Sequence, residues 1–372
     1  MAHICQSGEK VMVGVERYVV NLAEEQQIFG NSVTVITDHA GLLAETCRRH
    51  QVPVVVAQDL NWAPAPMGLP QEATVRALVN QLTCFGADLV NCHTAGAMDA
   101  TITAANTIHL PCVVTAHAGI SPQLRSIPNR MRVSANWQYS VICVARRHFE
   151  IFQRLGFPES NLNYIPIGTK AACPAGAEIQ DRPRRPNLIF VGEVSWQKGL
   201  DLAILALAEL RRRRGLTCPS LDIYGQDTDD AAYMREIVDV LDLNRVAHFK
   251  GYQQDVLANC PNGDIFVMTS RQETGPLVVL EAMSRGMPIV ASDVGEVTEM
   301  LPDQRYGRVI PVNSIMALAD AIDSLLSDIS EKRFNPRDPI ERHQSMYTAR
   351  IMAERIQAVY EKALQNNSIA TA

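Results

Sequence analysis

Short runs of four to six apolar residues alternate with longer amphipathic segments along most of this 372-residue chain. The segments between the runs repeat their apolar side chains at helical spacing, as Val15, Tyr18 and Leu22 do. Strands that alternate with helices build parallel sheets whose two faces are covered by those helices. We therefore predict an α/β fold made of βαβ units.

The alternation stops once, at residues 171–187, and then resumes. This stretch combines three prolines with small and charged residues, which is the composition of a linker. The length of the chain also favours two domains over one. We predict two doubly wound, Rossmann-like domains, at residues 1–170 and 188–335. Ligands of such folds bind beyond the carboxyl ends of the strands, so we expect the binding site in the cleft between the domains.

The elements follow from the pattern of apolar residues. Strands of the first domain are predicted at residues 2–7, 32–37, 52–57, 88–93, 111–117, 140–145 and 163–167, and helices at 14–29, 42–50, 71–85, 97–108 and 146–155. Strands of the second domain are predicted at 188–191, 221–224, 246–249, 265–269 and 288–291, and helices at 200–213, 230–241, 276–285 and 315–327. A long final helix is predicted near 340–364.

Charge and cysteine content narrow the class of protein. The net charge is −6, and the excess of acidic residues lies beyond residue 170, which argues against a nucleic-acid partner. Nine scattered cysteines include no Cys-x-x-Cys pair, as expected for reduced thiols in the cytosol. The first residues do not resemble a signal peptide, and no apolar run reaches membrane-spanning length. We expect a cytoplasmic protein, with any membrane contact peripheral at the inner face.

Residues 270–300 carry the most specific chemistry. Gly275 and Pro276 form a turn that opens a helix, and proline suits a first helical turn. The N–H groups of residues 277–279 then form an anion site at the positive end of the helix dipole. Glu273 and Glu281 would lie roughly 12 Å apart along a helical path, which exceeds the roughly 5–9.5 Å of glycosidase carboxylate pairs. The two acids are therefore predicted to hold the ends of one long, phosphate-bearing ligand.

The same stretch resembles the Glu-x7-Glu segment of retaining glycosyltransferases of family 4, which have the two-Rossmann-domain GT-B fold. The pattern of that family is matched at Glu273, Leu277, Val278, Leu280, Glu281, Ala282, Met283, Gly286, Pro288, Val290, Ala291 and Ser292. Thr274, Gly275 and Pro276 stand where the family has Gly-Phe-Gly. So many matches at fixed spacing make this a specific signal.

A second family motif falls at residues 192–201, where a strand ends and a helix begins. The resemblance implies that Lys198 neutralises the diphosphate of the donor. Glu193 stands where the family has an arginine, and a carboxylate beside a diphosphate should repel it. Either Glu193 turns away and Arg271 replaces the missing arginine, or the donor site is weakened. A solvated lysine at a helix start is the alternative interpretation of Lys198.

The resemblance extends to further loops. It places His117 beside the reacting carbon of the donor sugar, whereas a single histidine at a strand end is more often structural; His93 is expected to be structural or near the acceptor. Gly14 opens the first helix, and Gly225 and Tyr252 follow strands, where simple turn chemistry is an equally good explanation. The implied catalytic residues are His117, Lys198 and Glu273. The implied donor-binding residues are Gly14, Glu193, Lys198, Gly225, Tyr252, Arg271, Glu273, Gly275, Pro276, Leu277, Val278 and Glu281.

One acidic motif competes with this interpretation. Asp227 and Asp229 form Asp-x-Asp, a metal-binding motif of another glycosyltransferase fold. Because the motif precedes a helix, we predict that its acids cap the helix N-terminus. We expect no metal ion and no cofactor.

The resemblance implies a retaining glycosyltransferase that moves a hexose from a nucleotide-diphosphate sugar to a hydroxyl acceptor, with a UDP-sugar favoured over a GDP-sugar. The first domain would bind the acceptor and the second the donor. Residues 336–372 would form a helix that packs back on the first domain. Ile167 and Lys170 also depart from the family pattern, as Glu193 does. Two alternatives therefore stay open: a pseudoenzyme that binds a sugar nucleotide without turnover, and a sugar-nucleotide epimerase of the same fold.

Overall fold

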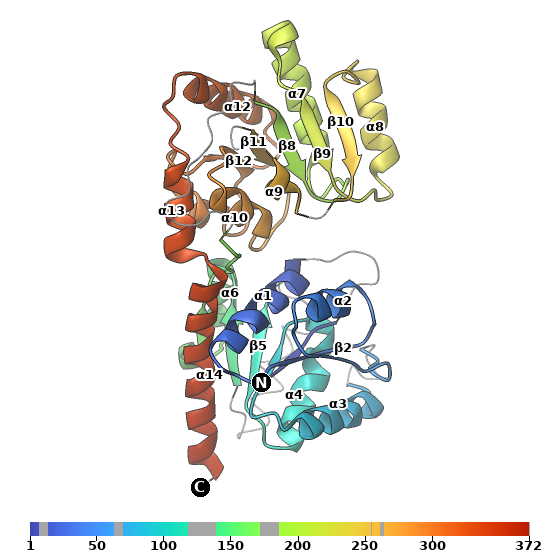
Figure 1. The fold of residues 1–372 in the computed structure, drawn as a ribbon, viewed down its shortest axis with the longest axis vertical. Helices are drawn as coiled ribbons and strands as arrows, with labels where there is room; N and C mark the ends of the chain where they lie inside the picture. The colour runs from blue at the N-terminus through green and yellow to red at the C-terminus, as the bar shows by residue number, and fades with distance from the viewer. Residues whose placement is uncertain are drawn as a thin grey trace. The chain divides into compact units, whose positions relative to one another are not determined.

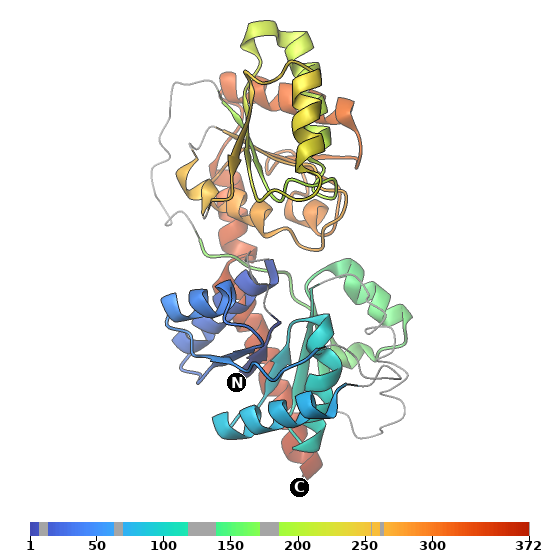
Figure 2. The same cartoon turned by 90° about the vertical axis from the view of Figure 1, so that its right-hand side faces the viewer.

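The computed structural model describes residues 1–6, 14–62, 70–117, 139–171, 186–253, 255–260 and 264–371. The chain divides into two compact units (Figures 1 and 2). Unit 1 comprises Met1–Thr169 together with Ala349–Ala372, and unit 2 comprises Lys170–Thr348. Each unit is built on a parallel sheet, which confirms the predicted α/β class. Most of the predicted linker, residues 172–185, lies outside the described residues.

Unit 1 contains a seven-stranded sheet in the order β3-β2-β1-β4-β5-β6-β7, with every described pair parallel. Its strands are β1 (Ala2–Ile4), β2 (Thr34–Thr37), β3 (Val54–Val56), β4 (Val90–Cys92), β5 (Cys112–Ala116), β6 (Tyr139–Cys143) and β7 (Leu162–Tyr164). The central strands are fully buried because helices cover both faces.

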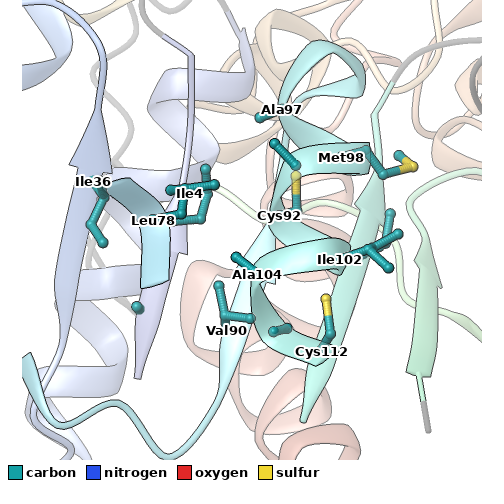
Figure 3. Close-up of a cluster of buried hydrophobic side chains, with 14 of the residues drawn as sticks. Ile4, Ile36, Leu78, Val90, Cys92, Ala97, Met98, Ile102, Ala104 and Cys112 are labelled. Atoms are coloured by element: carbon teal, nitrogen blue, oxygen red, sulfur yellow. The ribbon is translucent and has the colours of Figure 1, made fainter. Parts of the chain in front are cut away.

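The helices of unit 1 are α1 (Gly14–Ile28), α2 (Leu42–Arg49), α3 (Glu72–Phe85), α4 (Met98–Thr107), α6 (Arg146–Arg154) and α14 (Ala349–Thr371), with short 3-10 turns at Ala95–Ala97 and Glu159–Asn161. Helices α3 and α4 pack together on one face of the sheet, and α14 lies along α1 on the other (Figure 1). Ile4, Val90 and Cys92 point toward α3 and α4 in an apolar cluster, part of which Figure 3 shows.

Unit 2 contains a six-stranded parallel sheet in the order β10-β9-β8-β11-β12-β13. Its strands are β8 (Leu188–Val191), β9 (Leu221–Tyr224), β10 (Ala247–Gly251), β11 (Ile265–Met268), β12 (Ile289–Ser292) and β13 (Arg308–Ile310). The order reverses between β8 and β11, because β9 and β10 extend the sheet on one side of β8 and β11–β13 on the other. This reversal is the topological switch point of a doubly wound fold.

The helices of unit 2 are α7 (Leu200–Arg214), α8 (Ala231–Val240), α9 (Val256–Asn259), α10 (Leu277–Ser284), α11 (Val297–Met300), α12 (Ile315–Ser330) and α13 (Arg337–Met346), with a 3-10 turn at Gly215–Thr217. Helices α7 and α12 pack side by side and bury leucines and isoleucines against the sheet. Arg213, near the end of α7, donates to Asp320 and Asp323 of α12 at 2.7 and 3.1 Å.

The predicted single helix near 340–364 is wrong, because the structure contains two helices, α13 and α14. Tyr347 leaves the helical conformation, with φ −126° and ψ 21°. Its ring is buried in unit 2, and its hydroxyl donates to the Glu299 carbonyl at 3.0 Å. Helix α13 packs on α10, and α14 belongs to unit 1. The segment that joins unit 1 therefore begins at Ala349 rather than at residue 336.

Candidate active site

The loops that follow β8 and β11 meet at the switch point of unit 2. The loop after β8 carries Lys198, and the loop after β11 carries Glu273. Because parallel strands all end at the same edge of a sheet, the reversal of strand order leaves a crevice between these two loops. The sheet thus brings together two predicted residues that are far apart in the sequence.

Two glycines let the backbones at this edge approach closely. A Cβ atom on Gly225, after β9, would lie 1.7 Å from the Gly192 carbonyl oxygen after β8. A Cβ atom on Gly199 would lie 2.0 Å from the Thr269 carbonyl oxygen, and Gly199 also has a left-handed φ of 70°. The Thr269 hydroxyl donates to the Gly199 carbonyl at 2.7 Å. The loops after β8, β9 and β11 are therefore locked together through their main chains.

The Lys198 ammonium and the Glu273 carboxylate form an ion pair in this crevice. Lys198 Nζ donates to Glu273 Oε1 at 2.8 Å, and the Ser270 hydroxyl donates to the same oxygen at 2.9 Å. The exposed fractions of the two side chains are 28% and 16%, so both reach solvent. The pair offers a ligand one cation with N–H donors and one carboxylate acceptor. Ser270 was not predicted as a site residue. Its position between the end of a strand and Glu273 is the sequence feature that would have indicated it.

Helix α10 begins beside this pair. Pro276 lies just before the helix, with φ −73° and ψ 105°, and Leu277 is the first helical residue. A Cβ atom on Gly295, which has a φ of 57°, would lie 2.2 Å from the Thr274 carbonyl oxygen. The loop after β12 therefore lies directly on the turn that precedes α10 and holds the N-terminus of the helix at the sheet edge.

Arg271, the predicted replacement for the arginine that is missing at residue 193, is held by other groups of unit 2. Its guanidinium binds the Asp201 carboxylate with two hydrogen bonds, of 2.8 and 2.7 Å. It also donates to the Trp196 carbonyl and stacks on the Trp196 ring, 4.2 Å from the ring centroid. Asp201 lies in the first turn of α7, so this ion pair ties the loop after β11 to that helix. The seventy-residue separation of the partners is why sequence analysis missed it.

The other predicted donor-site residues are placed as follows. The Glu193 side chain is exposed, and its main-chain carbonyl accepts the N–H of Ser195. Tyr252 follows β10 and is 47% exposed. Glu281 is half-buried on α10. Gly275 precedes α10 and Val278 lies in its first turn, whereas Gly14 begins α1 in unit 1.

The predicted capping role of the acids before α8 is wrong. No side chain caps α8 at Asp230. Asp227 instead pairs with Arg235 at 2.9 Å, and Asp230 accepts the Trp196 N–H at 2.7 Å. Asp230 therefore steadies the loop that leads to Lys198, because it binds the main chain two residues before that lysine.

In unit 1, His117 follows β5 and contacts a second histidine, His93. Its Nε2 lies 3.3 Å from His93 Nδ1, and the ring of Tyr18 packs edge-on against it with the centroids 4.4 Å apart. His93 is buried and also contacts a third histidine, His3. His3 was not predicted. The sequence feature that indicates its position is the alternation of side chains along a strand: polar residues at alternate positions of apolar strands share one face of the sheet.

Burial sets the charge of these histidines. The pKa of His3 is lowered to about 4 and that of His117 to about 3, because burial removes the hydration that a charged imidazole needs. The pKa of His93 is lowered well below its ordinary value for the same reason, and the neighbouring rings lower it further. All three rings are therefore neutral near pH 7.

Two protein-family models and several proteins of known activity match this chain. The model of the family described as Glycosyltransferase Family 4 matches residues 12–171, and the model of Glycosyl transferases group 1 matches residues 177–339. The D-inositol 3-phosphate glycosyltransferase of Corynebacterium aurimucosum is 24% identical, over 96% of this chain and 93% of that protein. Glycogen synthase of Mycobacterium tuberculosis is 28% identical, over 59% of this chain; the match spans only 53% of that relative.

A solved structure shows the same fold along the chain. The Anabaena protein HepE, in complex with UDP and glucose, superposes with a TM-score of 0.79 and 20% identity, over 97% of this chain and 98% of that one. Among the described residues, no helix is both long enough and apolar enough to cross a membrane. Two consecutive family models and the parallel-sheet units together identify the chain: it belongs to the family 4 glycosyltransferases, which have the GT-B fold.

Proposed function

We propose that this protein is a retaining glycosyltransferase that moves a hexose from a UDP-sugar to a hydroxyl acceptor. The observation that carries the proposal is the contact of Lys198 with Glu273 at the switch point of unit 2, beside the N-terminus of α10. A cation, a carboxylate and the N–H groups at the start of a helix are the parts that a sugar diphosphate needs. Unit 2 would bind the donor and unit 1 the acceptor.

Each part of the site has a role in the proposed reaction. Lys198 carries three N–H donors, so it can keep Glu273 while it binds a phosphate oxygen. Arg271 is held by Asp201, so Lys198 and the N–H groups at the start of α10 would stabilise the charge that grows on the leaving diphosphate. Glu281 would accept the ribose hydroxyls, and Glu273 a hydroxyl of the sugar.

Retention would follow from substitution on one face of the sugar. Glu273 is engaged by Lys198 and Ser270, which suits orientation of a hydroxyl better than attack on the anomeric carbon. In the proposed step, the bond from the anomeric carbon to the diphosphate oxygen breaks, and the acceptor oxygen bonds to the same face. The acceptor proton passes to the leaving phosphate. No metal ion or cofactor takes part in this scheme.

The donor and the compartment are part of the proposal. UDP is favoured because the Anabaena neighbour binds UDP and glucose. The eight described cysteines are free thiols, which supports a reducing compartment. We place the protein in the cytoplasm, with any membrane contact peripheral.

Thermal stability with UDP, GDP, UDP-glucose, UDP-N-acetylglucosamine and GDP-mannose tests the donor site. A ligand at 100 times its dissociation constant adds about 2.7 kcal/mol, and roughly 2–4 °C per kcal/mol is expected for a unit of this size. We expect a rise with uridine nucleotides that Glu281→Ala abolishes and Glu236→Ala, on the exposed side of α8, does not. No rise with any nucleotide would overturn the proposal.

One observation favours the alternative of a protein that binds sugar nucleotides without turnover. Glu193 brings negative charge to the position where the family pattern has an arginine. If this residue disables the site, Glu193→Arg should tighten donor binding, as measured by calorimetry; weaker binding would show that Glu193 belongs to a working site.

Incubation with donor but without acceptor, followed by NMR, separates a transferase from an epimerase.

A further inference from the structure

A layer of polar side chains crosses the otherwise apolar centre of unit 1. Successive side chains of a strand point to opposite faces, so His3 of β1 and Asn91 of β4, which pair in register, share a face, and Thr115 of β5 joins them. His93 and His117 continue this face beyond the ends of β4 and β5. Helices α1 and α14 cover it. Buried polar groups of this kind need partners, and here they find each other.

The layer contains an unbroken chain of side chains that ends at His117. The Gln26 amide oxygen lies 2.7 Å from His3 Nε2, His3 Nδ1 lies 2.9 Å from His93 Nε2, and His93 Nδ1 lies 3.3 Å from His117 Nε2. Gln26 and His3 are completely buried, and His93 is 2% exposed. The chain is thus closed to solvent along most of its length.

The direction of this chain is a single choice. The rings are neutral, so each carries one N–H and one bare nitrogen. Every contact needs one donor and one acceptor, and therefore all contacts must run the same way. The Gln26 amide decides the direction: if its oxygen faces His3, each ring is protonated on Nε2, and if its nitrogen faces His3, each ring is protonated on Nδ1.

Tyr360 of α14 distinguishes the two directions. With the Gln26 oxygen toward His3, the buried Gln26 Nε2 has no hydrogen-bond partner. The Tyr360 hydroxyl oxygen already accepts from Asn91 Nδ2 at 2.6 Å, and the Gln26 side chain also lies close enough to affect its pKa. Because the two ends of an amide have the same shape, hydrogen bonding decides which end lies where. Turned over, the Gln26 nitrogen donates to His3 and its oxygen accepts the Tyr360 O–H, so both ends of the Gln26 amide have a partner.

We propose that Tyr360 and Gln26 are positioning residues that set one direction of hydrogen bonding, from Tyr360 through Gln26, His3 and His93 to His117. His117 then accepts at Nε2 and carries its proton on Nδ1. The ring presents an N–H donor to a ligand oxygen instead of a bare nitrogen. That last consequence rests on the proposed function and on the place beside the donor sugar that the family resemblance implies for His117; the direction of the chain does not.

Nitrogen NMR of the full-length protein, with ¹⁵N-labelled histidine and no ligand, tests the direction. Protonated and bare imidazole nitrogens give separate resonances, and single substitutions of the other six histidines leave those of His3, His93 and His117 to be assigned. We expect the Nδ1–H form for all three rings. The Nε2–H form in these rings would overturn the proposal.

A matched pair of variants tests Tyr360 itself. Tyr360→Phe keeps the ring that fills the core and removes only the O–H donor, so we expect a second set of resonances from Nε2–H rings. Tyr347→Phe loses a buried hydroxyl whose partner, the Glu299 carbonyl, lies in unit 2, and should leave the resonances of His3, His93 and His117 unchanged. Unchanged resonances in Tyr360→Phe would refute its role.

Turnover of the same variants separates this inference from the proposed function. If His117 contacts the donor sugar, Tyr360→Phe should lower kcat while Tyr347→Phe does not. The expected resonances combined with unchanged turnover would uphold the chain and refute the contact of His117 with the sugar. The absence of any turnover in the unaltered protein would refute the proposed function and leave the NMR result standing.

Discussion

Gly225→Ala is the substitution for which the structure gives the clearest expectation. The added Cβ atom would lie 1.7 Å from the Gly192 carbonyl oxygen, half of the 3.4 Å at which ordinary contact begins. Both atoms belong to the main chain or are fixed to it, so no side-chain rotation relieves the clash. The ends of β8 and β9 must separate.

The expected loss of folding stability follows from the main-chain hydrogen bonds that this separation breaks. The Gly192 N–H donates to the Tyr224 carbonyl at 2.9 Å, and the Val194 N–H to the Gln226 carbonyl at 2.9 Å. Losing two such bonds costs about 1–3 kcal/mol, the same range as overpacking a core. At roughly 2–4 °C per kcal/mol, a loss of about 2 kcal/mol lowers Tm by about 4–8 °C.

Gly192→Ala is the matched control, because it adds the same methyl group at the same sheet edge. Its Cβ atom would lie 3.6 Å from side-chain atoms of Lys198 and Phe190, an ordinary contact. Urea unfolding and thermal unfolding of both variants, without ligand, measure the difference. Equal stability of the Gly225→Ala and Gly192→Ala proteins would refute the argument from main-chain contact.

Three further predictions concern charge. Lys198→Met should lower kcat by about 100–1,000-fold through lost stabilisation of the leaving group, whereas Lys250→Met, which removes an exposed partner of Asp222, should leave turnover unchanged in the same assay. Asp201→Ala leaves the buried Arg271 guanidinium without its carboxylate and should cost about 3 kcal/mol in urea unfolding; a loss below about 1 kcal/mol would contradict this. The pKa of His3 is lowered from 6.5 to about 4, so below pH 6.5 the unfolded chain binds a proton that the folded one does not. His3 alone should lower stability by about 2 kcal/mol between pH 7.5 and 5, and a His3→Gln protein should show a slope that is shallower by this contribution.

The strands were the most predictable elements because a buried strand requires an apolar run. The strands at Leu188–Val191 and Leu221–Tyr224 match their predictions to the residue. The strand at Arg308–Ile310 was missed, because an edge strand of three residues that begins with arginine has no such run. The four-residue helices α9 and α11 were missed for a similar reason: one turn shows no helical period.

The parts of the candidate site that lie at the ends of strands could be predicted from the sequence. The ion pairs between side chains that are distant in the sequence could not. Lys198 and Glu273 follow neighbouring strands, so their meeting is a consequence of the topology. The pairing of Arg271 with Asp201 depends on rotamers and on the stacking of Trp196, which sequence spacing does not reveal. The buried position of His3 depends on strand parity, which the sequence contains as a polar residue between apolar neighbours of a buried strand.

The division of unit 1 between the two ends of the chain affects how the protein is made. Its main part ends at Thr169, whose carbonyl accepts the N–H of Ala349, the first residue of α14. All of unit 2 lies between these residues. At 5–20 residues per second, a ribosome needs roughly 10–40 s to cross that interval. During this time the face of the sheet that carries His3 and Asn91 has no α14 to cover it. The ribosome begins unit 2 after unit 1, yet it completes unit 2 first, because the α14 segment of unit 1 is synthesised last.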